Sequence, residues 1–325
     1  MRFRVLFGSA LAVLSSSLGL EAAQTPSVAA AQTPSAAATA PAQWPAECRL
    51  TRVATLPMTE HDGHVMVPVA VNGTTLNFIV DTGGYVTAIS ARVADVLGMK
   101  RHGIRFNRIT DVAGKAADFY VTADTFQMSH EVAKHFELMV APLGPGEDGI
   151  LAPDLLANFD VELDFGGMTL NLFRHRPCSE WTVYWTSAFI TLPFNMSERT
   201  HLRTDVTLDG KDTLAILDTG APTSLLSFEE ADDLFDLNGK SPGVQPLGMV
   251  GGASGGVVKS YRYPFKALTM GGVIVSNPHI LLTAGDNFLR TDRASLLLGM
   301  DVLRHLHIYI AYRDRTLYIS DAAAN

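Results

Sequence analysis

FIVDTGGYVTAIS, residues 78–90, is repeated as AILDTGAPTSLLS at residues 215–227. Each copy carries the triplet Asp-Thr-Gly after an apolar run typical of a β-strand, and each leads into a Ser and a short helical pattern. A single carboxylate in such a loop is an ordinary polar group. Two carboxylates held face to face can share one proton, because like charges that close cannot both ionise. The repeat therefore indicates Asp81 and Asp218 as a paired acid and base.

The similarity between the two halves extends well beyond the triplets. An offset of 137 residues aligns Asp81 with Asp218 and Ser90 with Ser227, and an offset of 147 aligns residues 149–172 with 296–319. A repeat of this length indicates that the fold itself is duplicated, so we expect two similar lobes. We place lobe one at residues 48–176, a linker at 177–187 and lobe two at 188–323.

Short strands separated by tight turns make up most of the secondary-structure signal. Asn72-Gly73 and Asp209-Gly210 each stand between two apolar runs, as two-residue hairpin turns do. Helical signal is brief, at residues 91–98 and 228–237, and Ser227 with Glu230 forms a capping box for the second helix. The sequence predicts an all-β fold with two pseudo-twofold-related β-barrel lobes and short helices.

The N-terminal segment is predicted to lie outside the fold. Residues 1–23 combine two early arginines, an apolar stretch and small residues, which is typical of a secretory signal peptide. A membrane anchor is the alternative, but the stretch is shorter than a bilayer-spanning helix. Residues 24–47 are a low-complexity tether, or a propeptide. Export favours the periplasm, with secretion as the alternative, and no stable membrane insertion once the signal is removed.

The net charge bears on the class of binding partner, and the cysteine content bears on disulfide bonding. The formal net charge is −8 and no basic cluster is present, which argues against nucleic acid as a partner. The only two cysteines, Cys48 and Cys178, open and close the first half, so an exported chain could join them in a disulfide. Two buried thiols are the alternative.

The two Asp-Thr-Gly loops, each paired with a later apolar segment ending in Gly-x-Asp or a close variant, resemble those of the aspartic peptidases. The Gly or Ala after each triplet is most similar to the retropepsin-like bacterial branch. The resemblance implies an endopeptidase with one cleft between the lobes, a polypeptide substrate and no cofactor. It implies a catalytic dyad with supporting loop residues: Asp81 and Asp218; Thr82, Gly83, Thr219 and Gly220. Both halves lie on one chain, so a monomer suffices.

Some positions depart from the family pattern. Gly299 ends the apolar segment of lobe two, but Ala152 takes its place in lobe one, where we expect it to crowd the backbone under the catalytic loop and to be tolerated. Gly84 and Ala221 lack the hydroxyl that pepsins place beside the dyad. Without that hydrogen bond the carboxylate pKa values should be higher, which predicts a mildly acidic pH optimum.

In the aspartic peptidases a β-hairpin flap covers the substrate. Residues 108–121 with Gly114, and residues 248–261 with Gly251 and Gly252, are the flap candidates, because a glycine-rich tip suits a mobile cover. A flexible surface hairpin is the alternative for each segment.

Three other functions fit parts of the sequence. Sugar-kinase and actin-like ATPases also use paired Asp-x-Gly loops, but they need long helices alternating with strands, which this sequence lacks. A bilobal binding protein without catalysis is the non-enzyme alternative. His130 and His135 suggest a zinc peptidase, but a zinc helix needs histidines four apart, so we predict no metal.

Asp154 and Asp301 are expected to support the catalytic loops through hydrogen bonds.

Overall fold

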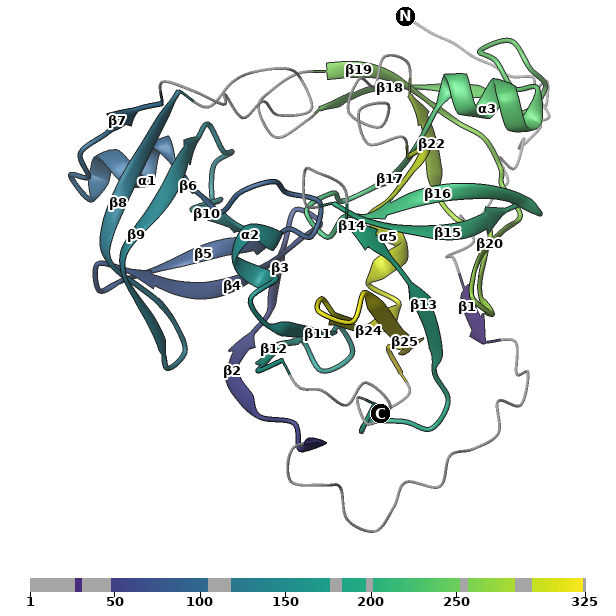
Figure 1. Ribbon diagram of the computed structural model, residues 1–325. Coiled ribbons are helices and arrows are strands. Elements are labelled where there is room, and N and C mark those ends of the chain that lie inside the picture. The colour runs from purple at the N-terminus through teal and green to yellow at the C-terminus, as the bar shows by residue number, and fades with distance from the viewer. Residues whose placement is uncertain are drawn as a thin grey trace, which may run out of the picture.

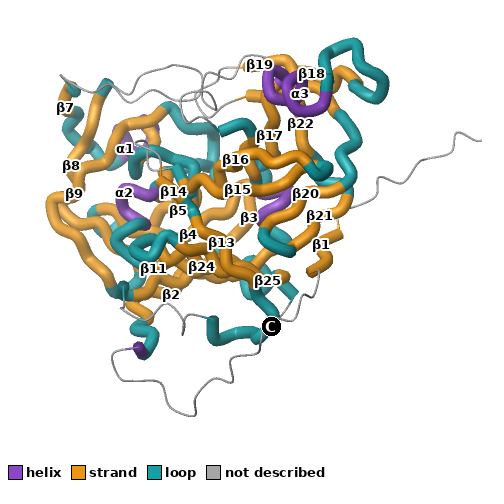
Figure 2. The backbone as a smooth tube through the Cα atoms, turned by 45° about the vertical axis from the view of Figure 1, so that its right-hand side comes forward, coloured by secondary structure: helices purple, strands orange, loops and turns teal. Residues whose placement is uncertain are grey.

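The chain folds into two β-rich lobes that share a third sheet (Figure 1). The computed structural model describes residues 27–30, 48–104, 118–175, 183–196, 201–251, 257–283 and 294–323. Strands dominate both lobes and helices are short (Figure 2), which confirms the all-β prediction. Within the described part of the chain, no helix has the length and apolar character needed to cross a membrane.

Lobe one is built on an eight-stranded sheet with strand order β3-β4-β5-β10-β6-β9-β8-β7. Its elements are β3 (Thr59–His61), β4 (His64–Val71), β5 (Thr74–Val80), β6 (Ala88–Ser90), α1 (Ala91–Val96), β7 (His102–Gly103), β8 (Phe119–Met128), β9 (Glu131–Ala141), β10 (Gly149–Leu151) and α2 (Pro153–Leu156).

Lobe two repeats this plan. Its elements are β14 (Asn195–Met196), β15 (Leu202–Leu208), β16 (Lys211–Leu217), β17 (Ser224–Ser227), α3 (Phe228–Phe235), β18 (Gln245–Gly251), β19 (Val257–Arg262), β20 (Ala267–Met270), β21 (Val273–Ser276), β22 (Ile280–Thr283), β23 (Leu296–Leu298) and α5 (Met300–Leu303). Along β15 the buried residues are Leu202, Thr204, Val206 and Leu208, the alternation expected of a strand with one face on the core.

Matching pairings confirm the internal duplication. In lobe one β10 pairs parallel with β5 and antiparallel with β6, and in lobe two β23 does the same with β16 and β17. Each central strand is therefore inserted between the strand that precedes an Asp-Thr-Gly triplet and the strand that follows it. This insertion fixes both ends of each Asp-Thr-Gly loop.

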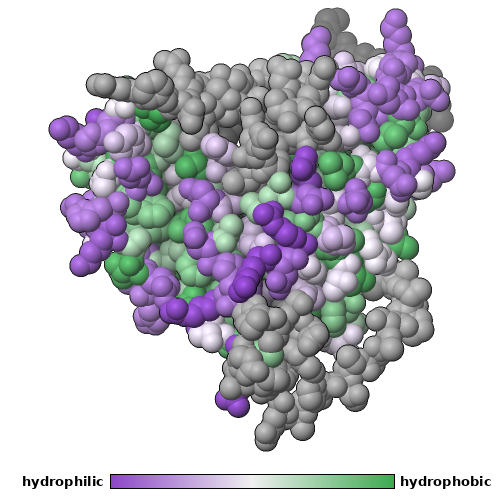
Figure 3. Space-filling model, viewed as in Figure 1, coloured by the Kyte–Doolittle hydropathy of each residue, from purple (hydrophilic) through white to green (hydrophobic). Residues whose placement is uncertain are grey.

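The local signals in the sequence have direct physical counterparts. Asn72 and Gly73 have φ angles of 50° and 80°, and Asp209 and Gly210 have 45° and 79°, so both hairpins use the left-handed turns that these residues favour. The Ser227 hydroxyl accepts from the Glu230 amide at 3.1 Å and caps α3. Glu229, Asp232 and Asp233 of α3 are exposed, and Figure 3 shows this hydrophilic surface at the upper right.

The third sheet belongs to both lobes and was not predicted. Its order is β13-β25-β24-β11-β12-β2, formed by β2 (Arg52–Pro57), β11 (Asp160–Asp164), β12 (Thr169–Phe173), β13 (Ile190–Pro193), β24 (Leu306–Ala311) and β25 (Thr316–Asp321). The sequence placed the hairpins at 160–173 and 307–320 in separate lobes. The structure pairs them at the centre of one sheet, where Leu163 lies opposite Ile308.

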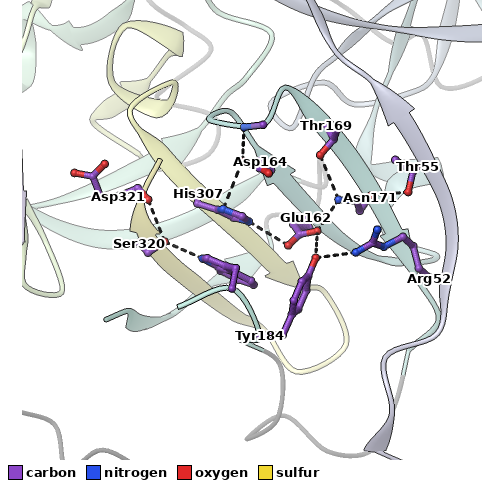
Figure 4. A network of polar contacts seen from close by, with 12 residues as sticks. Arg52, Thr55, Glu162, Asp164, Thr169, Asn171, Tyr184, His307, Ser320 and Asp321 are labelled. Atoms are coloured by element: carbon purple, nitrogen blue, oxygen red, sulfur yellow. Dashed lines mark hydrogen bonds and ion pairs between the residues drawn. The ribbon is translucent and has the colours of Figure 1, made fainter. Parts of the chain in front are cut away.

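A buried polar network lies where β11 of lobe one pairs with β24 of lobe two (Figure 4). His307 of β24 and Glu162 of β11 are 2% and 1% exposed, and Nε2 of His307 lies 3.1 Å from Oε1 of Glu162. The other Glu162 oxygen accepts from Asn171 at 2.7 Å and from the Tyr184 hydroxyl at 2.8 Å. Trp185 stacks on the His307 ring with centroids 4.1 Å apart. Residues just before lobe two are thereby held against the shared sheet.

The N-terminal segment differs in part from its prediction. Residues 27–30 form β1 (Ser27–Ala30), which pairs antiparallel with β21, so the expectation of a free tether does not hold for these four residues. The predicted signal peptide at 1–23 lies outside the described residues. Cys48 is buried and disulfide-bonded, whereas Cys178, the other cysteine of the chain, lies outside the described residues.

Candidate active site

Each Asp-Thr-Gly triplet begins where its strand ends. The Asp81 amide donates to the carbonyl of Leu151 at 2.9 Å, and the Asp218 amide donates to that of Leu298 at 2.9 Å. Both acceptors belong to the central strand of their lobe. The last backbone bond of that strand therefore fixes the position from which each aspartate side chain starts.

The two carboxyl groups meet between the lobes. Their side chains hydrogen-bond to each other, and each is also held by its own loop: the Gly83 amide donates to Oδ1 of Asp81 at 3.0 Å, and the Gly220 amide to Oδ1 of Asp218 at 2.9 Å. The sequence prediction of a close Asp81–Asp218 pair therefore matches the geometry.

The glycine of each triplet makes room for the carboxyl group of the opposite lobe. A Cβ atom added at Gly83 would overlap the carboxyl of Asp218, and one added at Gly220 would overlap the carboxyl of Asp81. Neither glycine has a positive φ. Both are therefore required by the close approach of the two loops and not by a left-handed turn.

Two threonine hydroxyls brace the loops across the lobe interface. Oγ1 of Thr82 donates to the carbonyl of Leu217 at 2.8 Å, and Oγ1 of Thr219 donates to that of Val80 at 2.6 Å. Thr82 and Thr219 are both buried. Each threonine of one lobe thus fixes the strand end that carries the Asp-Thr-Gly loop of the other lobe.

Burial and mutual repulsion act on the protonation of the pair. Burial raises the pKa of Asp81, while the hydrogen bond from Asp218 and the nearby charge of His201 oppose the rise. Burial, and then the charge of Asp81, raise the pKa of Asp218 well above its usual range. The pair can therefore retain one proton at a pH where solvent-exposed aspartates are ionised.

A second aspartate in each lobe supports the loop after the triplet. Thr87 donates to Oδ1 of Asp154 from its amide at 2.9 Å and from its hydroxyl at 2.7 Å. In lobe two Ser224 makes the equivalent bonds to Oδ1 of Asp301 at 3.0 and 2.6 Å. The supporting roles expected of Asp154 and Asp301 match this geometry, but sequence reasoning did not identify Thr87 and Ser224 as their partners.

Ala152 stands where the family pattern has glycine, and the residue that faces it, Gly84, is itself a glycine. Ala152 is fully buried, and a Cβ added at Gly84 would lie 3.1 Å from the Cβ of Ala152. In lobe two the order is reversed, because a Cβ added at Gly299 would lie 2.7 Å from the carbonyl oxygen of Ala221. Each lobe therefore places one glycine and one alanine at this contact, which explains how Ala152 is accommodated.

The β3–β4 turn reaches across to the Asp-Thr-Gly loop of lobe two. Gly63 in this turn has a φ of 84°, and an added Cβ would lie 2.9 Å from the Cβ of Pro222. Nearby, Nη1 of Arg304 lies 2.9 Å from Oε1 of Glu60. Lobe one thus contacts the Asp218 loop with a hairpin as well as with Thr82.

The other candidate residues have simpler placements. Gly251 is the last residue of β18 and pairs with Val257 across the β18–β19 hairpin. Gly114 and Gly252 lie outside the described residues. His130 and His135 lie exposed on the β8–β9 hairpin and not on a helix, which removes the basis for a zinc-helix reading.

Comparison with known proteins places this geometry in a family. The aspartyl protease family matches residues 67–155 and 204–302, one segment in each lobe. No protein with a curated description matches the chain. Among solved structures, basic 7S globulin from soybean has 8% identity and a TM-score of 0.46, over 84% of this chain and 95% of its own. Conglutin gamma from lupine seeds has 12% identity and a TM-score of 0.47, over 82% and 94%.

The two matched segments contain both triplets and both supporting aspartates, and together they cover more than half of the residues. The chain therefore belongs to the aspartyl protease family.

Proposed function

We propose that this protein is an aspartic endopeptidase in which Asp81 and Asp218 activate a water molecule to hydrolyse a peptide bond. The observation that carries the proposal is the hydrogen-bonded carboxyl pair at the lobe interface, held by reciprocal threonine braces. A pair of carboxyls that shares one proton supplies a base and an acid at the same site.

The reaction follows from that single proton. The ionised carboxylate takes a proton from water as the water oxygen attacks the amide carbon, and the protonated carboxyl gives its proton to the carbonyl oxygen. A tetrahedral gem-diol results. The first carboxyl then gives its new proton to the amide nitrogen, the C–N bond breaks, and one hydroxyl of the gem-diol returns a proton to the second carboxyl. The products are a carboxylic acid and an amine, and the dyad regains its starting state.

One feature of lobe two suits an extended polypeptide as the substrate. The β18–β19 hairpin of lobe two exposes Leu247 and Met249, two apolar side chains on one strand, which suits contact with apolar substrate residues. We further propose, from residues 1–23, that the protein is exported to the periplasm and works there as a monomer.

The test is cleavage of a diverse peptide mixture by the exported chain, read by mass spectrometry from about pH 4 to about pH 7. Asp81→Asn and Asp218→Asn are the matched variants, because each keeps the side-chain shape and removes the ionisable group. Cleavage by the parent that either variant abolishes would support the proposal. Peptides bound but uncut by the parent would favour a binding protein, and cleavage that survives both substitutions would refute the dyad.

A further inference from the structure

The N-terminal segment supplies a strand to the sheet of lobe two (Figure 2). β1 pairs antiparallel with β21 over its whole length, with Ser27 opposite Ser276 and Ala30 opposite Val273. On its other side β21 pairs with β20. Without β1, β21 would be the end strand of the eleven-stranded sheet, and one row of its backbone N–H and C=O groups would have no strand partner.

The composition of β21 favours pairing and does nothing to discourage it at a sheet edge. Its sequence is Val-Ile-Val-Ser, which is rich in β-branched residues and contains no charge and no proline. Val273 and Val275 are buried, and Ile274 lies on the opposite face of the strand. An open strand of this kind is a template for any other β-strand that reaches it.

The strands at the other sheet ends carry their own protection. β18 contains Pro246 with an irregular register beside it, β13 ends at Pro193, and β2 ends at Pro57. β3 has only three residues and includes Glu60, and β7 has only two residues. Among these described strands β21 alone lacks such a feature, and it is the one that β1 covers. β1 is itself short, and Pro26 directly precedes it in the sequence.

β1 also joins lobe two to the shared sheet. It contacts β25 as well as β21. The turn of the β20–β21 hairpin meets the same sheet, because a Cβ added at Gly271 would lie 2.7 Å from Cδ2 of Leu192. From Ala30 the chain runs on to Cys48, which is buried and disulfide-bonded shortly before β2. The N-terminal segment is therefore held at one end by a β-ladder and at the other by a disulfide.

The position at which the precursor is cut decides whether the mature protein keeps β1. Residues 22–23 and residues 29–31 both supply the small residues that a signal peptidase recognises. A cut after Ala23 leaves β1 in the mature chain. A cut after Ala31 removes β1 and opens the edge of β21.

We propose that the outer edge of β21 is a docking site for residues 27–30, that the mature protein keeps these residues, and that they prevent β21 from pairing with a second copy of the chain. A strand in the same chain has an effective concentration on the order of millimolar, which a second copy does not reach in dilute solution. The processing step rests on the proposed export. The docking depends on neither export nor catalysis.

Hydrogen exchange read by mass spectrometry tests the docking. The double variant Val28→Pro/Ala29→Pro removes a ladder donor whichever of the two neighbouring amides faces β21. Ala37→Pro is the matched control, because it adds proline to the same low-complexity segment outside β1. In the double variant we expect the β21 amides that face β1 to exchange at least about tenfold faster than in the parent, and in Ala37→Pro we expect the parental rate.

Two further measurements complete the test. The intact mass of the exported parent should give an N-terminus upstream of Ser27, and sedimentation over a dilution series should show self-association of the double variant but not of the parent. Unchanged exchange at β21, equal acceleration in Ala37→Pro, a double variant that stays monomeric, or a parent that begins after Ala30 would each overturn the inference. A parent that retains residues 1–23 would refute the export and not the docking. None of these readings needs peptide cleavage, so failure of the proposed function is distinguishable.

Discussion

The amide of Thr82 donates to Oγ1 of Thr219 at 3.1 Å, and the amide of Thr219 donates to Oγ1 of Thr82 at 3.1 Å. Each hydroxyl also donates to a strand carbonyl of the opposite lobe. Every donor and acceptor in this exchange is buried, so the loss of one hydroxyl leaves two buried backbone groups of the opposite lobe without their hydrogen-bond partner.

Removing one of these hydroxyls should therefore cost more than an ordinary hydrogen bond. Thr82→Val keeps the side-chain volume but leaves the carbonyl of Leu217 and the amide of Thr219 without their partner. We expect a loss of about 2 kcal/mol or more in the free energy of unfolding, measured by urea denaturation. Thr82→Ser keeps the hydroxyl and is the control. A Thr82→Val protein as stable as Thr82→Ser would show that the brace contributes little.

The Gly84–Ala152 contact should behave as a coupled pair. Gly84→Ala places the new Cβ 2.9 Å from Oδ2 of Asp81 and 3.1 Å from the Cβ of Ala152, and it should destabilise the protein by about 1–3 kcal/mol. Ala152→Gly should recover part of that loss, because it removes one of the two crowded atoms. Gly299→Ala in lobe two meets backbone atoms of residues 221 and 223, so Ala221→Gly should not rescue it. Additive effects at Gly84 and Ala152 would contradict the contact.

Protonation of the dyad should make the fold more stable in mild acid than at neutral pH. The folded-state pKa values of Asp81 and Asp218 are raised, so the folded protein binds more protons than the unfolded chain between the unfolded and folded pKa values. Stability is fully present below the unfolded pKa and falls as pH rises through that window. Asp218→Asn should flatten this fall and raise the free energy of unfolding at pH 7 by about 1 kcal/mol or more. Urea denaturation across pH would measure it, and a parent whose stability rises through the same window would contradict the prediction.

The stability of the protein should depend on both partners of the buried Glu162–His307 pair between β11 and β24. His307→Leu leaves the Glu162 carboxylate buried beside an apolar group, and we expect a cost of about 3–5 kcal/mol. Asp164→Asn is the control, because Asp164 is 18% exposed and lies 3.6 Å from Nδ1 of His307. Chemical unfolding followed by tryptophan fluorescence would report both stability and the environment of Trp185, which stacks on His307. Equal stability of the two variants would argue against a structural role for the pair.

Local and repeated features could be read from the sequence. The strand beginning at His64, the Asn72-Gly73 turn and the cap at Ser227 follow from residue type and short spacing, and the structure confirms all three. The proximity of Asp81 and Asp218 followed from the duplication. These features share one property: the interactions that define them are short in sequence or repeated in both halves.

Interactions between distant, non-equivalent residues could not be read in this way. Glu162 and His307 are 145 positions apart, and an offset of 147 aligns Glu162 with a tyrosine. The compensation between Gly84 and Ala152 depends on a contact of two backbones that no periodicity reports. The pairing of β1 with β21 joins a segment of low complexity to a sheet edge, and composition carried no signal for it.

The shared sheet has a consequence for cooperativity. Its two central strands, β11 and β24, come from different lobes, and its outer strands, β2 and β13, begin the two halves of the fold. Neither half of the chain can complete this sheet alone. Separate unfolding of one lobe would break the β11–β24 ladder and would remove the polar partner of whichever residue, Glu162 or His307, belongs to the surviving half. We therefore expect the two lobes to unfold together in one transition, so a destabilising substitution in either lobe should destabilise both.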